Sequence, residues 1–410
     1  MSLAKTTHLV FEDRREISAS VFLIVCGAVL SGCSLMNPGP VVPPDSVNVA
    51  TSGVAHRYQV IYGFKNIPDA ATPFDGLTEV GGTFYGTAYS GGLEVGAVFT
   101  VAASGAENVL YDFKRGVDGA KPFAGLTDLH GTLYGTTQEG GTKGDGTVFS
   151  ITTSGTETVL HSFTGGRDGE YPRSELADVG GMLYGTTYLG GSSQDGTVFE
   201  IGPSQPETVL YGFKAGSDGA HPYSRLTDVH GVLFGTTSEG GGAGNYGTVF
   251  EITTSGREHV LYRFKGGVDG AEPIAGLTCV GKRLYGTTRL GGTRGYGTVF
   301  AITTSGVKTV LYNFEGSPDG AKPFSQLINV GGELFGTTSA GGAHDYGTIY
   351  EISASGAEVV LHRFNEMHGR GPVGSLAYAN GELYGTTAWG GGNARENGPN
   401  CCGVVYEVSP

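Results

Sequence analysis

Apolar and polar side chains alternate along short segments of this chain, and glycine-rich stretches separate the segments. In "NVLYDF", Val109, Tyr111 and Phe113 fall on one face of an extended segment and Leu110 falls on the other. Two apolar faces are typical of a strand whose sheet packs against neighbouring sheets on both sides. Gly or Pro interrupts every candidate helical period. The pattern therefore predicts an all-β protein of short strands and tight turns.

The alternating pattern recurs along the chain as a repeat. The triplet "YGT" or "FGT" occurs seven times, at spacings of 49 to 51 residues. Its aromatic residues are Tyr85, Tyr134, Tyr184, Phe234, Tyr285, Phe335 and Tyr384. Each of the first six copies contains four strand patterns, which read "LTDL", "TLYGTT", "GTVFSIT" and "ETVLHSF" in the second copy. Seven four-stranded antiparallel units predict a seven-bladed β-propeller, and an open β-solenoid is the alternative.

The two ends of the repeat region complement each other. "RYQVIYGF" (residues 57–64) has the pattern of a fourth strand without the preceding three, and the last copy, ending in "GVVYEVSP", has three strands without a fourth. A solenoid would need atypical capping repeats at its ends, and neither end has this character. We therefore expect the N-terminal strand to complete the last blade in a 3+1 arrangement.

The repeat can be compared with known families once its consensus is written out. Units of the form "LYGTTxxGGxxxxGTVFxITTSGxExVLYxFxGxDGAxP" resemble the GloVer tandem repeat of exported bacterial proteins of the "choice-of-anchor" group, and the resemblance covers residues 57–410. It implies an exported, envelope-anchored repeat protein, and it brings no catalytic residue. The seventh copy departs from the pattern, because "NEMHGRGP" replaces "GxDGAxP".

The first 53 residues differ in composition from the repeats. "ISASVFLIVCGAVL" (residues 17–30) is too short to span a bilayer and fits the apolar region of a signal peptide. "LSGC" resembles a lipobox, which implies acylation of Cys33, although an ordinary secretory signal is the alternative. We expect a signal peptide over 1–32, a flexible tether over 33–53 and the propeller over 54–410. The implied location is the outer membrane, on its periplasmic or surface side.

The net charge and the absence of enzyme and metal-binding motifs limit the functions that the sequence supports. A formal net charge of −14 disfavours both nucleic acid and an anionic membrane surface as partners. We therefore expect membrane contact through the lipid anchor alone. We also expect the protein to be a monomer. The chain has no "HExxH", "GxSxG" or P-loop motif, and no Cys/His spacing that suits zinc. The sequence therefore predicts no catalytic residue, no metal and no cofactor.

The connections between strands two and three and between blades are long and variable, and in a meander they share one face. Binding is expected on such loops. The candidate residues are Tyr89, Glu139, Tyr188, Glu239, Arg289 and Trp389. Aromatic and polar groups of this kind stack on sugars or hold peptides, and packing against an adjacent loop is the alternative.

Three further sets of residues carry possible chemistry. The interblade aspartates Asp69, Asp118, Asp168, Asp218, Asp269 and Asp319 are expected in Asx-type turns, with cation binding as the alternative. The innermost strands carry Glu79, Asp128, Asp178, Asp228, Cys279, Asn329 and Tyr378, whose acids are expected to bind turns or to line the channel. We expect the thiol of Cys279 to be buried. Cys401 and Cys402 are adjacent in the sequence and are candidates for a vicinal disulfide.

These features together predict a binding or scaffolding module for a glycan, a peptide or an envelope protein. A polysaccharide-active enzyme that uses channel acids such as Asp178 and Asp228 is one alternative. A purely structural envelope protein is the other.

Overall fold

The computed structural model describes residues 56–65, 67–392 and 402–410. Cys33, the expected signal peptide and the tether lie outside the described residues, as does Cys401. The described residues belong to one compact unit, Ala55–Pro410. Within them the only helical element is the short 3-10 turn η1 (Gly267–Asp269), and no helix is long and apolar enough to cross a membrane.

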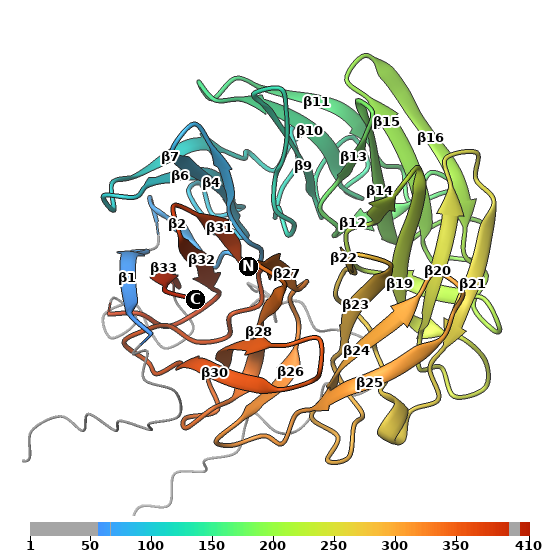
Figure 1. Cartoon of the computed structure of the whole chain (residues 1–410). Coiled ribbons are helices and arrows are strands. Elements are labelled where there is room, and N and C mark those ends of the chain that lie inside the picture. Colours follow the sequence, from blue (N-terminus) through green and yellow to red (C-terminus); the bar gives the residue numbers. More distant parts are fainter. Residues whose placement is uncertain (1–55, 66, 393–401) are drawn as a thin grey trace, which may run out of the picture. The chain divides into compact units, whose positions relative to one another are not determined.

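Seven sheets of four or five strands surround a common centre (Figure 1). The first blade has β3 (Thr78–Val80), β4 (Thr83–Ala88), β6 (Ala97–Ala102) and β7 (Glu107–Asp112). The second has β8 (Thr127–Leu129), β9 (Thr132–Thr137), β10 (Thr147–Thr152) and β11 (Glu157–Ser162). The fifth has β22 (Thr278–Val280), β23 (Arg283–Thr288), β24 (Thr298–Thr303) and β25 (Lys308–Asn313). Their antiparallel meander confirms the predicted propeller blade.

The third, fourth and sixth blades each gain a short strand from the interblade segment. The third has β12 (Glu170–Pro172), β13 (Ala177–Val179), β14 (Met182–Leu189), β15 (Thr197–Gly202) and β16 (Gln205–Gly212). The fourth has β17 (Gly219–Pro222), β18 (Thr227–Val229), β19 (Val232–Gly240), β20 (Thr248–Thr253) and β21 (Glu258–Arg263). The sixth has β26 (Gly320–Pro323), β27 (Ile328–Val330), β28 (Glu333–Gly341), β29 (Thr348–Ile352) and β30 (Glu358–Arg363). The equivalent segment before the first blade forms a separate pair, β2 (Ala70–Ala71) with β5 (Ser90–Gly91).

The seventh blade is closed by the N-terminal strand. β31 (Ala377–Ala379), β32 (Glu382–Thr387) and β33 (Val404–Val408) are followed in the sheet by β1 (Tyr58–Gly63). β1 is antiparallel to β33, with Tyr58 opposite Val408 and Gly63 opposite Val404. Figure 1 shows blue β1 beside red β33. The predicted 3+1 closure is confirmed, and the ring has no open end.

The hydrophobic core lies between blades rather than within one blade. Phe163, which follows the last strand of the second blade, packs with Leu183 and Phe199 of the third blade, and none of the three is exposed to solvent. The rings of Phe163 and Phe199 are 5.3 Å apart in an edge-to-face arrangement. The same contact recurs for Phe113 and Phe149, and for Phe213 and Phe250. Each blade therefore depends on its neighbours to bury its apolar faces.

Candidate functional site

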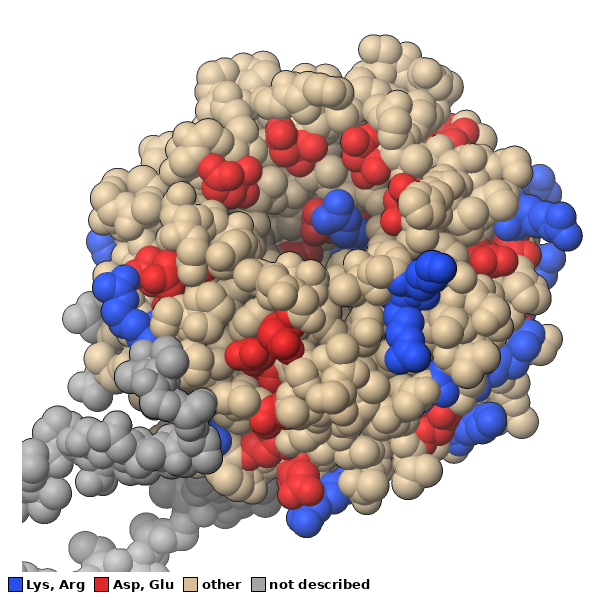
Figure 2. Space-filling view, viewed as in Figure 1, with Lys and Arg blue, Asp and Glu red and all other residues tan. Residues whose placement is uncertain are grey.

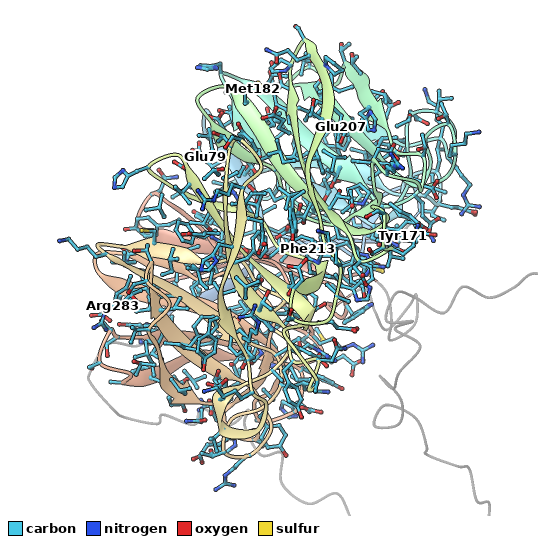
Figure 3. The ribbon with its side chains drawn as sticks, turned by 90° about the vertical axis from the view of Figure 1, so that its right-hand side faces the viewer. Glu79, Tyr171, Met182, Glu207, Phe213 and Arg283 are labelled. Atoms are coloured by element: carbon cyan, nitrogen blue, oxygen red, sulfur yellow. The ribbon has the colours of Figure 1, made fainter. Side chains whose placement is uncertain are left out.

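The ring has two faces with different connections. The tight turns between strands one and two and between strands three and four form one face, which we term the hairpin face, and the longer connections form the loop face. Figure 3 places Glu79 and Arg283, beside first hairpins, on one side and Tyr171, from an interblade segment, on the other. Figure 2 shows that the ring is hollowed at its centre, with basic and acidic side chains in the hollow.

The residues that line this hollow come from one motif. Every interblade segment ends in Pro-x-x-x-Leu, and the variable positions of the motif line the hollow. The first of these positions is occupied by Phe74, Phe123, Arg173, Tyr223, Ile274, Phe324 and Val373. Each blade thus contributes the beginning of its innermost segment to a shared central site.

Four aromatic side chains at the first position form a continuous band, which we term the aromatic belt: Phe74, Phe123, Tyr223 and Phe324. The rings of Phe74 and Phe123 stack with centroids 5.0 Å apart. Phe123 and Tyr223 meet edge to face at 5.5 Å, and Tyr223 and Phe324 at 5.7 Å. The guanidinium of Arg173 lies 5.6 Å from the Tyr223 ring centroid, within the range of a cation–π contact. The belt is apolar with a cationic group among its rings.

Charged side chains occupy the later positions of the motif. Arg225 Nη1 donates a hydrogen bond of 2.6 Å to Glu175 Oε1. Burial raises the pKa of Glu175 to about 7, although the positive charge of Arg225 opposes this rise. Asp75 accepts backbone N–H bonds from Gly76 at 2.7 Å and from Gly125 at 2.8 Å.

The two carboxyl groups of the hollow both lie beside Gly125. A Cβ added to this glycine would lie 3.5 Å from Asp75 Oδ2 and 3.6 Å from Glu175 Oε2. The absence of a side chain at Gly125 therefore leaves the space between the two carboxyl groups open. The hollow offers two acids, the guanidinium groups of Arg173 and Arg225, and aromatic faces within one small volume.

Three of the predicted site residues surround the aromatic belt. The Phe74 ring contacts Tyr89 at 5.2 Å and Trp389 at 5.8 Å, in both cases edge to face. Tyr188 lies 6.0 Å from Tyr223, and the Arg173 guanidinium lies 4.2 Å from the Tyr188 ring centroid. Ring closure thus brings together aromatic residues from the first, third and seventh blades.

The three charged candidates form ion pairs and hydrogen bonds with neighbouring loop residues. Lys121 Nζ lies 2.7 Å from Glu139 Oε1, and Arg289 pairs with Glu272. Glu239 lies 3.4 Å from His221 Nδ1, and its other oxygen accepts a bond from Asn245. These contacts hold the loops in place.

The interblade aspartates are in local turns, as predicted. Each accepts a hydrogen bond from the backbone N–H four residues earlier, for example Asp118 from Lys114 at 3.0 Å. The same bond is made by Asp69, Asp168, Asp218, Asp269 and Asp319. Within the described residues, no group of three or more His, Cys, Asp or Glu side chains is arranged to hold a metal ion.

The acids of the innermost strands bind their own hairpins. Asp178 accepts the N–H of Gly181 and Asp228 accepts that of Gly231, both at 2.8 Å. Asp128 and Glu79 do the same. The acids that line the hollow are instead Asp75 and Glu175.

The predictions for the cysteines have different outcomes. The prediction of a buried Cys279 is wrong: this thiol is exposed, because the middle residue of β22 points away from the blade interface. Cys402 is buried and disulfide-bonded. Because Cys401 lies outside the described residues, the vicinal pair stays a prediction.

Sequence reasoning missed Asp75, Glu175, Arg225 and the aromatic belt. The search for variable positions concentrated on the residues after "GTT" and passed over Pro-x-x-x-Leu. A comparison of the seven copies would have found the signal, because Pro and Leu are the same in every copy, whereas the first x changes among Phe, Tyr, Arg, Ile and Val and the third among Gly, Glu, Arg, Gln and Ser.

Comparisons with known proteins extend this description. The profile described as the Gloeobacter/Verrucomicrobia repeat matches residues 47–188, 96–282 and 259–410. No curated protein matches the chain.

Solved structures resemble the chain only distantly. One is a putative 6-phosphogluconolactonase of Bacteroides fragilis, with TM-score 0.49, 16% identity, and coverage of 76% of this chain and 87% of the other. Another is the PQQ-bound aldose sugar dehydrogenase of Streptomyces coelicolor, with TM-score 0.43, 16% identity and coverage of 70% and 94%. A third is a gluconolactonase of Xanthomonas campestris, with TM-score 0.42, 13% identity and coverage of 68% and 82%. Nothing about the activity of this chain follows from likenesses at this level.

Proposed function

The chain belongs to the Gloeobacter/Verrucomicrobia repeat family, and from the hollow of its ring we propose that the propeller is a binding module for a saccharide. The observation that carries the proposal is the aromatic belt of Phe74, Phe123, Tyr223 and Phe324 beside the Glu175–Arg225 pair. The apolar face of a sugar ring packs against aromatic rings, and few polar groups then orient the ligand.

The polar groups of the hollow suit the hydroxyl groups of such a ligand. Arg225 supplies only donors, Asp75 supplies acceptors, and Glu175 acts as donor or acceptor according to its protonation. Because burial raises the pKa of Glu175 to about 7, both forms are present near neutral pH. A hydroxyl group donates and accepts, so it can pair with either form.

A binding assay with one substitution tests this proposal. A glycan array identifies the saccharide, and isothermal titration calorimetry then compares the parent with Arg225→Ala. We expect binding of the variant to weaken about 10- to 100-fold, since hydrogen bonds from charged groups contribute about 1.5–3 kcal/mol. Arg257→Ala is the matched control, because Arg257 is exposed on a hairpin turn. If both variants bind as the parent does, the hollow is not the site.

A glycoside hydrolase is the second candidate, favoured by the raised pKa of Glu175. A carboxyl group that titrates near pH 7 is suited to general acid catalysis, and Asp75 would be the second carboxyl group. The saccharide that binds is incubated with the parent and with Glu175→Gln, and new reducing ends are measured. Binding without product supports the module, whereas turnover that Glu175→Gln abolishes supports the enzyme.

We extend the proposal to the cell envelope, where a lipid on Cys33 would hold the propeller. The supporting feature is the "LSGC" segment at residues 30–33. We expect Cys33→Ser to move the protein from the membrane fraction to the soluble fraction, because one residue carries the acyl chains. Unchanged fractionation would reject the lipid anchor but leave the binding site untouched.

A further inference from the structure

A set of equivalent contacts at the outer rim joins every blade to the next. Near the end of the fourth strand, an aromatic residue of one blade binds the interblade residue that follows it. A residue within the first three positions of the next blade's fourth strand faces this pair. At five of the seven interfaces that facing residue is a glutamate: Glu107, Glu157, Glu207, Glu258 and Glu358.

The contact between the first two blades illustrates the arrangement. Tyr111 donates a hydrogen bond of 3.0 Å to Asp118 Oδ2, and its hydroxyl oxygen lies 3.4 Å from Glu157 Oε2. Tyr312, Asp319 and Glu358 repeat the contact, at 3.0 Å and 3.5 Å. A phenol has one proton to donate, so it cannot satisfy two carboxylates at once.

Each of the five glutamates also has an oxygen without a partner. The Oε1 atoms are buried, and none of them has a hydrogen-bond partner. Glu207, for example, has only 7% of its side chain exposed. Leaving a carboxylate oxygen buried and unpaired is costly, whereas a neutral carboxyl group has lower desolvation cost and gains a donor.

The two remaining interfaces show what this position requires. Between the fourth and fifth blades the residue is Lys308, whose Nζ donates to the backbone oxygen of Asp269 at 2.6 Å and to Asp269 Oδ1 at 3.0 Å.

Between the sixth and seventh blades the residue is Tyr58. Its hydroxyl donates to the backbone oxygen of His368 at 2.7 Å. His368 stands where other copies have the interblade aspartate, four residues before Pro. Lys308 and Tyr58 thus donate to equivalent backbone carbonyls, those of Asp269 and His368. A glutamate can do so only when it is protonated.

We propose that Glu107, Glu157, Glu207, Glu258 and Glu358 are protonated in the closed ring and direct their O–H groups at the preceding interblade carbonyl. The propeller then takes up five protons on folding and releases them as the solution becomes alkaline. Deprotonation places two negative charges at each of these interfaces and removes the donor, so the blades repel each other at their rims.

The charges around the five sites agree with this assignment. Burial raises the pKa of each glutamate from its ordinary 4.5 to about 7, and the facing aspartate adds to the rise. The cations that oppose it are Lys65, Lys114, Lys214, Arg263 and Arg363. At the third site His161 lies 3.9 Å from Glu207, and burial lowers the pKa of this histidine.

The direction of the pH effect follows from the sign of these shifts. A pKa that is higher in the folded state stabilises the fold fully below 4.5 and loses that contribution as the pH rises through 7. The buried histidines act oppositely, because a lowered pKa destabilises the fold as the pH falls below 6.5. The melting temperature of the parent should therefore fall between pH 6.5 and pH 8.

Glutamine mimics the neutral acid and tests the proposal. The full chain with all five Glu→Gln substitutions is melted at pH 6 and pH 8. We expect the variant to melt at a higher temperature than the parent at pH 8. We also expect its melting temperature to change much less between pH 6 and pH 8 than that of the parent. Glu366→Gln, at an exposed position, is the control and should leave the pH dependence unchanged. A variant that melts below the parent at pH 8 would overturn the proposal.

Two single substitutions keep the test informative if the fivefold variant does not fold. Glu258→Lys copies the natural interface of Lys308, and Lys308→Glu creates a sixth acidic site. The first should reduce the fall in melting temperature between pH 6 and pH 8, and the second should increase it. Equal pH dependence in both would contradict the proposal. If Ca²⁺ at pH 8 raises the melting temperature of the parent but not of the Gln variant, the sites hold a metal ion instead of protons.

Discussion

At the scale of single residues, the most repeated positions support packing and the most variable ones line the hollow. The Gly of "YGT" lies opposite the third-strand Phe, and a Cβ on Gly185 would come within 2.5 Å of Phe199 Cζ and 2.8 Å of Leu176 Cδ2. Thr187 and Thr197 join their hydroxyls at 2.8 Å, which satisfies two buried groups. Repetition of this triplet therefore reflects sterics and hydrogen bonding.

A single methyl group at Gly185 tests this interpretation. We expect Gly185→Ala to lower the free energy of unfolding by about 1–3 kcal/mol, because the ring of Phe199 must move. Gly212→Ala is the control, since its nearest atom lies 4.0 Å away. Urea denaturation measures both. Equal stabilities of the two variants would mean that the Phe ring accommodates the methyl group at no cost.

At the scale of elements, β1 acts as the clasp of the ring. Tyr58 stacks on His362 of the sixth blade, with centroids 3.7 Å apart, and contacts Tyr406 of its own blade at 5.5 Å. Burial and the neighbouring His368 lower the pKa of His362 to about 3, so the imidazole that stacks on Tyr58 is uncharged at neutral pH. One side chain thus joins the first strand to the sixth and seventh blades.

Truncation of Tyr58 should open this clasp. We expect Tyr58→Ala to destabilise the domain by about 3 kcal/mol, as for other large aromatic truncations. The exposed neighbouring residue offers a control, and Gln59→Ala should change the free energy of unfolding by less than about 0.5 kcal/mol. Guanidinium unfolding curves give both values. A loss shared equally by the two variants would show that strand pairing, and not Tyr58, closes the ring.

At the scale of the whole molecule, closure makes each blade dependent on two neighbours. The interblade clusters continue around the ring, and the cluster of Val60, Leu376 and Phe335 joins the chain's ends to the sixth blade. Disruption of one interface therefore exposes apolar surface on two blades. Such mutual dependence favours one cooperative unfolding transition.

The single tryptophan allows this cooperativity to be measured. Trp389 follows β32 and reports on the seventh blade, whereas far-ultraviolet circular dichroism reports on all strands. We expect the thermal midpoints from tryptophan fluorescence and from circular dichroism to coincide. An earlier fluorescence transition would show that the seventh blade unfolds by itself and that the ring opens at its clasp.

The sequence by itself determined the strands, the seven blades and the closure of the ring. Strand alternation is local, and its seven repetitions leave few architectures that can bury both faces of every sheet. The local turns of the interblade aspartates were predictable for the same reason, since Asp118 and its donor Lys114 are four residues apart.

Only the tertiary structure decided where the hollow lies and which residues form it. Asp75, Glu175 and Arg225 are 50 to 150 residues apart in the sequence, and closure of the ring brings them to one central site. The tertiary structure also showed that Glu157 faces Asp118 across a blade interface with one oxygen unpaired. Burial and hydrogen-bond balance depend on contacts between blades, so no pattern within one repeat reveals them.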